Sequence, residues 1–328
     1  MELVSAVIST YRRPVEILRR AVESVLRQTW PAMELIVVND CPDDRELSES
    51  IRRMLNMLDP KILYLVHEKN QGACAARNTG LAAAKGSYIA FLDDDDEWLP
   101  EKIEKQMACM TGDVALVRCD SWQISENGVR YQHLAVPSKD PLSAILRSNF
   151  IGSTSFPLLR TECVRAVGGF DPNVKVCQDY DLWIRMVSHY GLAYVPEPLV
   201  NYYVSQDSTF RRDGRKYIEG KLFLTEKYRD LYEGRPDDYL FALNSGALTG
   251  LLMRRDLSIY RALKKAAFRY KFWNRYNFFL LPMKVFGKAT STPLRLFIRA
   301  PFTSTFIFQG RRLFGIGMAS SPVRYRIV

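Results

Sequence analysis

Apolar and polar residues alternate between Met1 and Pro100 as short strand-like runs separated by amphipathic helical segments. Runs rich in β-branched or aromatic residues predict strands at 4–9, 34–38, 62–67 and 88–92. Apolar residues at helical spacing predict helices at 14–27, 45–58 and 73–84, and a further helix opening at Pro100. Strands and helices that alternate at this spacing form βαβ units. The sequence therefore predicts an α/β fold with a mostly parallel, Rossmann-like central sheet and flanking helices.

The segment from 111 to 206 is less regular. Short strands are predicted at 115–118, 122–125, 156–159, 192–195 and 200–203. Helices are predicted after Pro141, after a Thr161 cap as far as Gly168, and from about Asp179. In the last of these helices the apolar residues fall on one face, which leaves Asp179 at the N-terminus and outside the core.

The pattern changes after Gln206. Helices are predicted at 215–232 and 237–252, and a basic, aromatic-rich tail follows. We therefore expect an α/β domain over residues 1–210 and a helical, basic region over 211–328.

Polar residues stand at the end of each early strand: Thr10 and Tyr11, Asn39 and Asp40, Asn70 and Gly72, and the four aspartates 93–96. Open α/β sheets bind ligands outside the carboxyl ends of their strands. Four adjacent carboxylates repel one another and raise one another's pKa values unless a cation relieves them. The pattern indicates a ligand crevice with a bound cation. The alternatives are a solvated acidic turn at 93–96 and ordinary turn chemistry at the other strand ends.

The turn after the first strand contains no glycine. A dinucleotide-binding fold would place Gly-x-Gly-x-x-Gly there, and a P-loop needs Gly-Lys-Ser/Thr, which occurs nowhere in the chain. Phosphates bound in this crevice would therefore be held by a metal and by arginines.

Four segments at these strand ends together resemble the family 2 glycosyltransferases of the GT-A fold. They are Val-Ile-Ser-Thr-Tyr-Arg-Arg (7–13), Val-Val-Asn-Asp (37–40), Asn-Gln-Gly-Ala-Cys-Ala-Ala-Arg-Asn-Thr-Gly (70–80) and Phe-Leu-Asp-Asp-Asp-Asp-Glu-Trp (91–98). The resemblance spans roughly residues 3–205. It implies a nucleoside-diphosphate sugar donor, usually a UDP-sugar, and a divalent metal, Mn²⁺ or Mg²⁺, on the Asp-x-Asp carboxylates.

The resemblance also implies roles for individual residues. Thr10, Tyr11 and Asp40 would line the nucleobase pocket, and Asn70 and Arg77 would lie near the ribose and diphosphate. Asp93 would lie near the ribose and the metal, and Asp95 would ligate the metal. The other residues expected to bind the donor are Arg13, Gly72 and Asp94.

A glycosyl transfer also needs a base to accept the proton of the attacking hydroxyl, and a carboxylate is the usual choice. The family uses the aspartate of a Glu-Asp pair. The corresponding pair here is Gln178-Asp179, so Asp179 is the predicted base. The alternative is an acidic residue favoured by the helix dipole, the role expected of Asp181.

The cysteines and the first residues of the chain indicate where the protein is located. The six cysteines have no Cys-x-x-Cys spacing and are expected to be reduced. No signal-peptide pattern opens the chain, so we expect a cytoplasmic protein.

The net charge of +10 arises from residues 254–328, which contain 16 Lys and Arg and one acidic residue. Basic residues interleaved with aromatic ones favour binding to an anionic membrane surface over binding to nucleic acid or a plain solvated face. No apolar run reaches the roughly 18 residues needed to span a bilayer.

The sequence thus predicts an inverting, metal-dependent glycosyltransferase on the cytoplasmic membrane face. It would add one sugar to a lipid-linked or polysaccharide acceptor. The alternatives are a sugar-phosphate nucleotidyltransferase of related fold and a non-catalytic, membrane-tethered sugar-binding protein.

Overall fold

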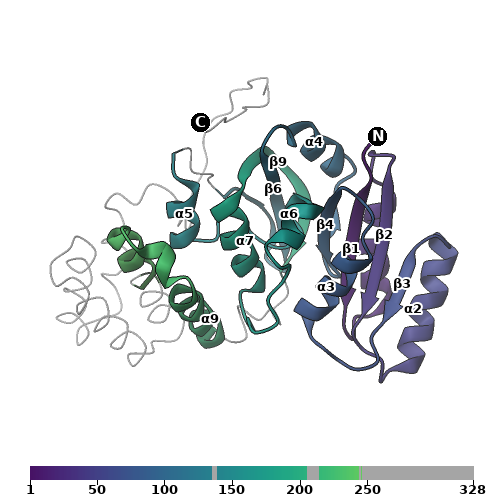
Figure 1. Ribbon diagram of the computed structural model, residues 1–328. Helices are drawn as coiled ribbons and strands as arrows, with labels where there is room; N and C mark the ends of the chain where they lie inside the picture. The colour runs from purple at the N-terminus through teal and green to yellow at the C-terminus, as the bar shows by residue number, and fades with distance from the viewer. Residues whose placement is uncertain (135–138, 205–213, 244, 246–328) are drawn as a thin grey trace. The chain divides into compact units, whose positions relative to one another are not determined.

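Three βα units build the first half of a nine-stranded sheet (Figure 1). Their elements are β1 (Val4–Thr10), α1 (Val15–Leu26), β2 (Met33–Asn39), α2 (Arg45–Leu58), β3 (Leu63–Val66), α3 (Ala73–Ala83) and β4 (Tyr88–Asp93). The strands pair in parallel in the order β3-β2-β1-β4, so their carboxyl ends share one edge. The computed structural model describes residues 1–134, 139–204, 214–243 and 245.

The two faces of β1 are covered by different helices. Val4, Ala6 and Ile8 pack with buried residues of α1 in the main core. Val7, on the opposite face, lies against Gly80 of α3. A strand buried on both faces is apolar nearly throughout, which is the pattern seen in the sequence.

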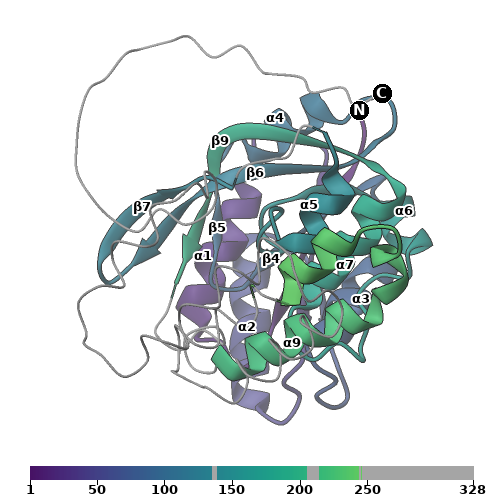
Figure 2. The same cartoon turned by 90° about the vertical axis from the view of Figure 1, so that its left-hand side faces the viewer.

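The second half of the sheet is mixed in direction. Its elements are β5 (Glu97–Trp98), α4 (Lys102–Cys109), β6 (Val114–Ser125), β7 (Gly128–Gln132), α5 (Pro141–Arg147), β8 (Leu158–Arg160), α6 (Thr161–Ala166), α7 (Gln178–His189) and β9 (Gly191–Tyr203). Strand β8 runs antiparallel to β4 and β6, and β6 is parallel to β9. Figure 2 shows the hairpin of β6 and β7 extending on the left, beyond α1 and β5.

The α/β fold with a mostly parallel central sheet is confirmed, and several element predictions need correction. The strands predicted at 115–118 and 122–125 form the single strand β6, and those at 192–195 and 200–203 form β9. Pro196 and Pro198 of β9 lie where the β6–β9 register shifts, around Asp120. A bulge tolerates residues that cannot donate a ladder hydrogen bond.

Thr161 does not cap α6. It is the first helical residue, after Arg160, and its hydroxyl donates to the Gly86 carbonyl at 2.7 Å. Strands β5 and β7 were not predicted.

The described residues divide into two compact units. The first contains 1–134, 139–145 and 149–204, and the second contains 146–148, 214–243 and 245. The second unit includes α9 (Gly214–Lys227), the 3-10 helix η1 (Arg229–Tyr232) and a helical stretch at 236–243. The domain boundary predicted at 210 falls in 205–213, outside the described residues, and stays a prediction. So does the basic tail at 254–328.

All six cysteines lie in the described residues, and none of them forms a disulfide there. No helix within the described ranges combines the length and apolarity needed to cross a membrane.

Gly80 permits the close packing of α3 on β1, which supplies a stability test. A Cβ added at Gly80 would lie 2.3 Å from Cγ1 of Val7, a side chain that is almost fully buried. We expect Gly80→Ala to lower the free energy of unfolding by about 1–3 kcal/mol, because the helix must move off the strand. Urea unfolding measures this change. Ala82→Leu, on the exposed side of the same helix, should change it by less than about 0.5 kcal/mol; equal effects would contradict the packing argument.

Candidate active site

A cavity of about 330 Å³ opens at the carboxyl ends of β1, β2 and β4. It is lined by Ser9, Thr10, Tyr11, Arg13, Asp40, Ala73, Ala76, Arg77, Asp93, Asp94 and Asp95. Eight of the residues predicted from the sequence therefore share this cavity. Another cavity, of about 400 Å³, is lined by residues such as Trp30, Met33 and Lys61 and contains none of the predicted residues.

Residues 93–96, the acidic loop, follow β4 directly. Asp93 is held most tightly: its Oδ1 accepts hydrogen bonds from Nη2 of Arg77 and the hydroxyl of Thr154, both at 2.8 Å. Its Oδ2 accepts one from Ser153 at 3.0 Å. Burial opposes ionisation of Asp93, but Arg77 and these hydrogen bonds outweigh it and lower the pKa of the carboxyl group.

Asp94 and Asp95 face the segment after β1. Asp94 accepts from the Thr10 hydroxyl at 2.7 Å and from Nε of Arg13 at 2.8 Å. Asp95 Oδ2 lies 3.1 Å from Nη2 of Arg13, and about a third of the side chain is exposed. Burial and the charges of Asp93 and Asp94 raise the pKa of Asp95 to about 6, against the opposing effect of Arg13.

Asp96 is fully buried and is not among the residues that line the cavity. It accepts from the Ser155 hydroxyl at 2.6 Å and from the backbone N–H of Tyr203 at 3.0 Å. Burial, with the neighbouring carboxylates, raises its pKa well above the ordinary value. Asp96 therefore joins the loop to β9.

The Asp40 carboxylate organises the turn before α3. Its Oδ1 lies 2.7 Å from Nδ1 of His67 and accepts from the backbone N–H of Gln71 at 2.8 Å. Its Oδ2 accepts from the Asn70 side chain at 3.1 Å and from the N–H of Gly72 at 2.7 Å. Gly72 has φ +88°, which an L side chain rarely adopts. Asn70 and Gly72 thus lie behind the cavity wall, fixed by Asp40, while Asp40 itself lines the cavity.

Asp179 stands in the first turn of α7, which follows Cys177 in the left-handed conformation (φ 63°). The carboxylate is half-buried, and its Oδ2 lies 3.4 Å from the side-chain nitrogen of Asn149. Burial raises the pKa of Asp179 to about 6; Arg77 lowers it and Asp93 raises it. Asp179 therefore lies within the electrostatic reach of Arg77 and Asp93, two paired residues that line the cavity.

Asp181, two residues further on, is fully buried and pairs with Nη2 of Arg185 at 2.5 Å in the same helix. This ion pair is structural. The two aspartates of α7 therefore differ in environment: Asp179 is half-buried and influenced by Arg77 and Asp93 of the cavity, whereas Asp181 is neutralised in the core.

The family model of glycosyl transferase family 2 matches residues 5–168, half of the chain. The chain belongs to glycosyl transferase family 2. The putative colanic acid biosynthesis glycosyl transferase WcaA of Escherichia coli is 32% identical over 251 residues, covering 74% of this chain and 87% of that protein. The UDP-Glc:alpha-D-GlcNAc-diphosphoundecaprenol beta-1,3-glucosyltransferase WfgD of E. coli is 32% identical over 186 residues, covering 56% and 70%.

A solved structure agrees on the fold. The mannosyltransferase PcManGT from Pyrobaculum calidifontis, in complex with GDP-Man and Mn²⁺, aligns with a TM-score of 0.52 at 14% identity, over 87% of this chain and 86% of that one. This family 2 glycosyltransferase therefore has the GT-A fold.

The family's divalent metal can be tested against the side chains present. Within the described ranges no three His, Cys, Asp or Glu residues are grouped to hold a metal. Among the described residues only Oδ2 of Asp95 is engaged by another residue, whereas both oxygens of Asp93 are. A hard cation takes oxygen ligands, which a carboxylate, donor phosphates and water would supply together. The donor set fits a metal held by Asp95 and completed by the substrate.

Several residues around this family 2 site were missed from the sequence. Segment 153–155 supplies a hydroxyl to Asp93 from both Ser153 and Thr154. Arg20 of α1 donates to the Asp95 carbonyl at 2.5 Å and stacks 3.7 Å from the Tyr203 ring centroid. Nothing local in the sequence marks Ser153, Thr154 or Arg20 as site residues, because their contacts with the acidic loop are tertiary.

Proposed function

We propose that this family 2 glycosyltransferase moves a sugar from a nucleoside-diphosphate sugar, a UDP-sugar in the first instance, to an acceptor hydroxyl with inversion at the anomeric carbon. The observation that carries the proposal is an acidic, arginine-containing cavity together with Asp179, a carboxylate of raised pKa that does not line the cavity but is within electrostatic reach of Arg77 and Asp93, which do. The names of WfgD and WcaA favour a lipid-linked or polysaccharide acceptor of the cell envelope.

The donor would lie along the strand ends. Tyr11, half-exposed, offers a ring face to the nucleobase beside Thr10 and Asp40. Arg77 faces the crevice and would meet the ribose and diphosphate, together with Arg13. A divalent metal on Asp95, Mn²⁺ or Mg²⁺, would stabilise the charge that grows on the leaving diphosphate.

Asp179 would act as the base. The acceptor oxygen bonds to the anomeric carbon while the bond from that carbon to the diphosphate oxygen breaks. The hydroxyl proton passes to the Asp179 carboxylate, and the nucleoside diphosphate leaves. One base and one direct displacement invert the configuration, because no enzyme-bound glycosyl intermediate forms. A pKa near 6 keeps Asp179 ionised at neutral pH while making it a stronger base than an exposed aspartate.

The assay that tests the function uses a panel of nucleotide sugars, membrane extract as acceptor, and Mn²⁺ or Mg²⁺. We expect one donor to give acceptor-dependent release of nucleoside diphosphate. Release of pyrophosphate from a nucleoside triphosphate and a sugar phosphate would indicate a nucleotidyltransferase. Tight donor binding without turnover on any acceptor would indicate a sugar-binding protein.

The pH dependence should follow Asp179. Because the base works only when deprotonated, kcat/KM should fall as the pH drops through about 6, approaching tenfold per pH unit below it. The profile is measured at saturating metal. Asp179→Asn should remove this limb from whatever activity is left, and a parent profile that stays flat from about pH 7 to 5 would contradict the assignment.

The basic tail, residues 254–328, lies outside the described residues, and we propose that it binds an anionic membrane surface on the cytoplasmic side. Its 16 basic residues and one acidic residue support the proposal. A chain ending at residue 253 should leave the membrane fraction and become soluble in cell fractionation. An unchanged distribution would contradict membrane binding through this segment.

A further inference from the structure

Four aromatic side chains form a row beside one another: Trp122 on β6, Tyr131 on β7, His133 directly after β7, and Tyr194 on β9. We name Trp122, Tyr131, His133 and Tyr194 the aromatic strip. Neighbouring ring centroids along it are 5.6, 6.3 and 5.9 Å apart. Trp122 is 36% exposed, Tyr131 is 45% exposed and the His133 side chain is 49% exposed. Within the described ranges the indole N–H of Trp122 has no hydrogen-bond partner. The strip therefore presents ring surface and polar atoms to solvent, and the proposed mechanism uses none of them.

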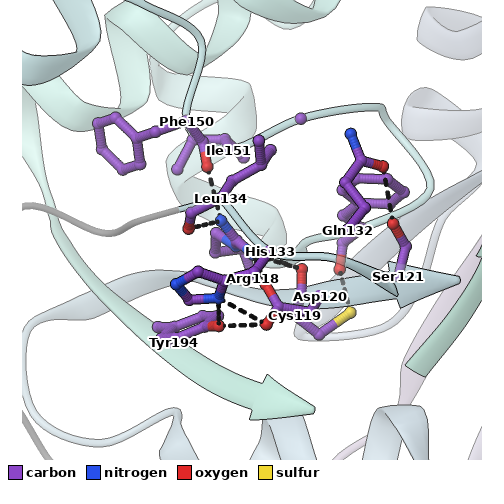
Figure 3. A network of polar contacts seen from close by, with 12 residues as sticks. Arg118, Cys119, Asp120, Ser121, Gln132, His133, Leu134, Phe150, Ile151 and Tyr194 are labelled. Atoms are coloured by element: carbon purple, nitrogen blue, oxygen red, sulfur yellow. Dashed lines mark hydrogen bonds and ion pairs between the residues drawn. The ribbon is translucent and has the colours of Figure 1, made fainter. Parts of the chain in front are cut away.

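The strip is built on a buried carboxylate (Figure 3). Asp120 Oδ2 accepts hydrogen bonds from the hydroxyls of Tyr131, at 2.6 Å, and Tyr194, and lies 2.9 Å from Nδ1 of His133. Its Oδ1 pairs with Arg118, and both side chains are fully buried. Burial and the Asp120 charge raise the pKa of both tyrosines, so their hydroxyls stay protonated.

This anchoring has two consequences for binding. The buried ion pair leaves the surface of the strip without a strong net charge, which suits a neutral ligand better than an anionic lipid. Three of the four rings, those of Tyr131, His133 and Tyr194, are also held by Asp120 before a ligand arrives, and a preordered surface loses less entropy on binding.

The strip stands at the same edge of the sheet as the active site. Leu158 of β8 pairs with Ala90 of β4 on one side and with Val117 of β6 on the other. Strands β4 and β6 both run antiparallel to β8, so they run in the same direction as each other. Asp93 lies three residues after Ala90 and Asp120 three residues after Val117, so the two aspartates are level with each other along the strand direction. The aromatic strip thus begins at the level of the acidic loop and continues past it.

Segment 149–155 connects the strip with the active site. At one end, the Phe150 carbonyl accepts a hydrogen bond from Nη1 of Arg118 at 2.8 Å. Next to it, Asn149 contacts Asp179, and the hydroxyls of the same segment bind the acidic loop. One short loop therefore contacts both Arg118, which holds Asp120 beneath the strip, and Asp179, the proposed base.

We propose that the aromatic strip is a binding subsite for sugar residues of the acceptor glycan, an inference that rests on the proposed function for the identity of its ligand. Sugar rings present C–H faces that pack on aromatic rings, and hydroxyls that bond to groups such as the indole N–H and the imidazole. Aromatic side chains with a polar end suit such an amphipathic, uncharged ligand. The occupant is the acceptor and not the donor, because the strip lies on β6, β7 and β9 while the donor cavity lies at β1, β2 and β4.

The test measures glycan binding directly, without relying on turnover. Saturation-transfer NMR is recorded on the full chain with cellotetraose, chitotetraose and mannotetraose. We expect the parent to transfer saturation to at least one of them, and Trp122→Ala to weaken its affinity about tenfold, the loss expected for one stacking ring. Trp122→Phe, which keeps a ring, should retain most of the binding. Phe223→Ala, which removes an exposed aromatic ring in α9, should bind as the parent does.

The outcomes separate this proposal from the proposed function. No binding by the parent, or equal binding by Trp122→Ala, overturns the subsite. Concentration-dependent dimerisation that Trp122→Ala abolishes, without glycan binding, assigns the strip to a second copy of the chain and also overturns it. Where transfer is measurable, Trp122→Ala should raise KM for the acceptor and leave KM for the donor unchanged; an unchanged acceptor KM contradicts the subsite alone. Glycan binding without any sugar transfer contradicts the proposed function alone.

Discussion

Replacing Asp179 with asparagine should lower kcat for sugar transfer by about 10²–10⁴-fold, the usual contribution of a positioned base. The side-chain volume and the contact with Asn149 are kept, so the donor should bind as tightly as it does to the parent. Steady-state transfer rates combined with equilibrium titration of the donor nucleotide separate these two effects. An unchanged kcat would show that Asp179 is not the base and only interacts favourably with the helix dipole at the N-terminus of α7.

Asp181→Asn is the matched control for this variant, because it removes a carboxylate from the same helical turn. Asp181 is fully buried and paired with Arg185, so its loss leaves a partly buried arginine uncompensated. We expect a loss of unfolding free energy of about 3 kcal/mol and a kcat close to that of the parent in the folded fraction. If the Asp181 variant lost the base-dependent limb of the pH profile instead, the roles of the two aspartates would be reversed.

Asp95→Asn should have the second largest effect. Asp95 lines the cavity and has one oxygen that no other described residue engages. Burial and the charges of Asp93 and Asp94 raise its pKa to about 6, and a cation would relieve that repulsion. Removing the ligand charge should cost transition-state stabilisation of several kcal/mol, a decrease in kcat/KM of about 10²–10³-fold. The metal concentration giving half-maximal activity should also rise.

Glu97→Gln is a suitable comparison for the metal titration. Glu97 follows the acidic loop but pairs with Arg27 and Asn201, away from the cavity. The Glu97→Gln variant should reach half-maximal activity at the same metal concentration as the parent. An Asp95→Asn variant with an unchanged metal response would remove Asp95 from the metal site.

The parallel half of the fold was predictable because its signals are local. Each βα unit has an apolar strand, a turn and an amphipathic helix within about 30 residues, so periodicity alone locates it. Strand β7 had a local signal that was overlooked, the Asn127-Gly128 sequence at the tight turn that joins it to β6. Strand β5 has none, because Trp98 is in a strand only through its pairing with Val200. Pairing over long sequence separations is not encoded in local pattern.

The residues of the active site also fall into those that the sequence could predict and those that it could not. Residues at strand ends, such as Thr10 and Asp95, could be found because parallel strands bring their carboxyl ends together. Ser153 and Thr154 could not, because their contacts with Asp93 depend on where β8 inserts beside β4. His67 was assigned to a strand, yet its ring lies between Asp40 and Thr79. The direction of a side chain at a strand end is set by tertiary contacts.

The measurement that tests the central claim most directly is the anomeric configuration of the product. The full chain is incubated with the α-configured UDP-sugar that the donor panel identifies, an acceptor and Mn²⁺, and the new glycosidic linkage is examined by proton NMR. Direct displacement assisted by the single base Asp179 predicts a β-linked product and release of UDP. An α-linked product, or no product from any nucleotide sugar, would contradict the account.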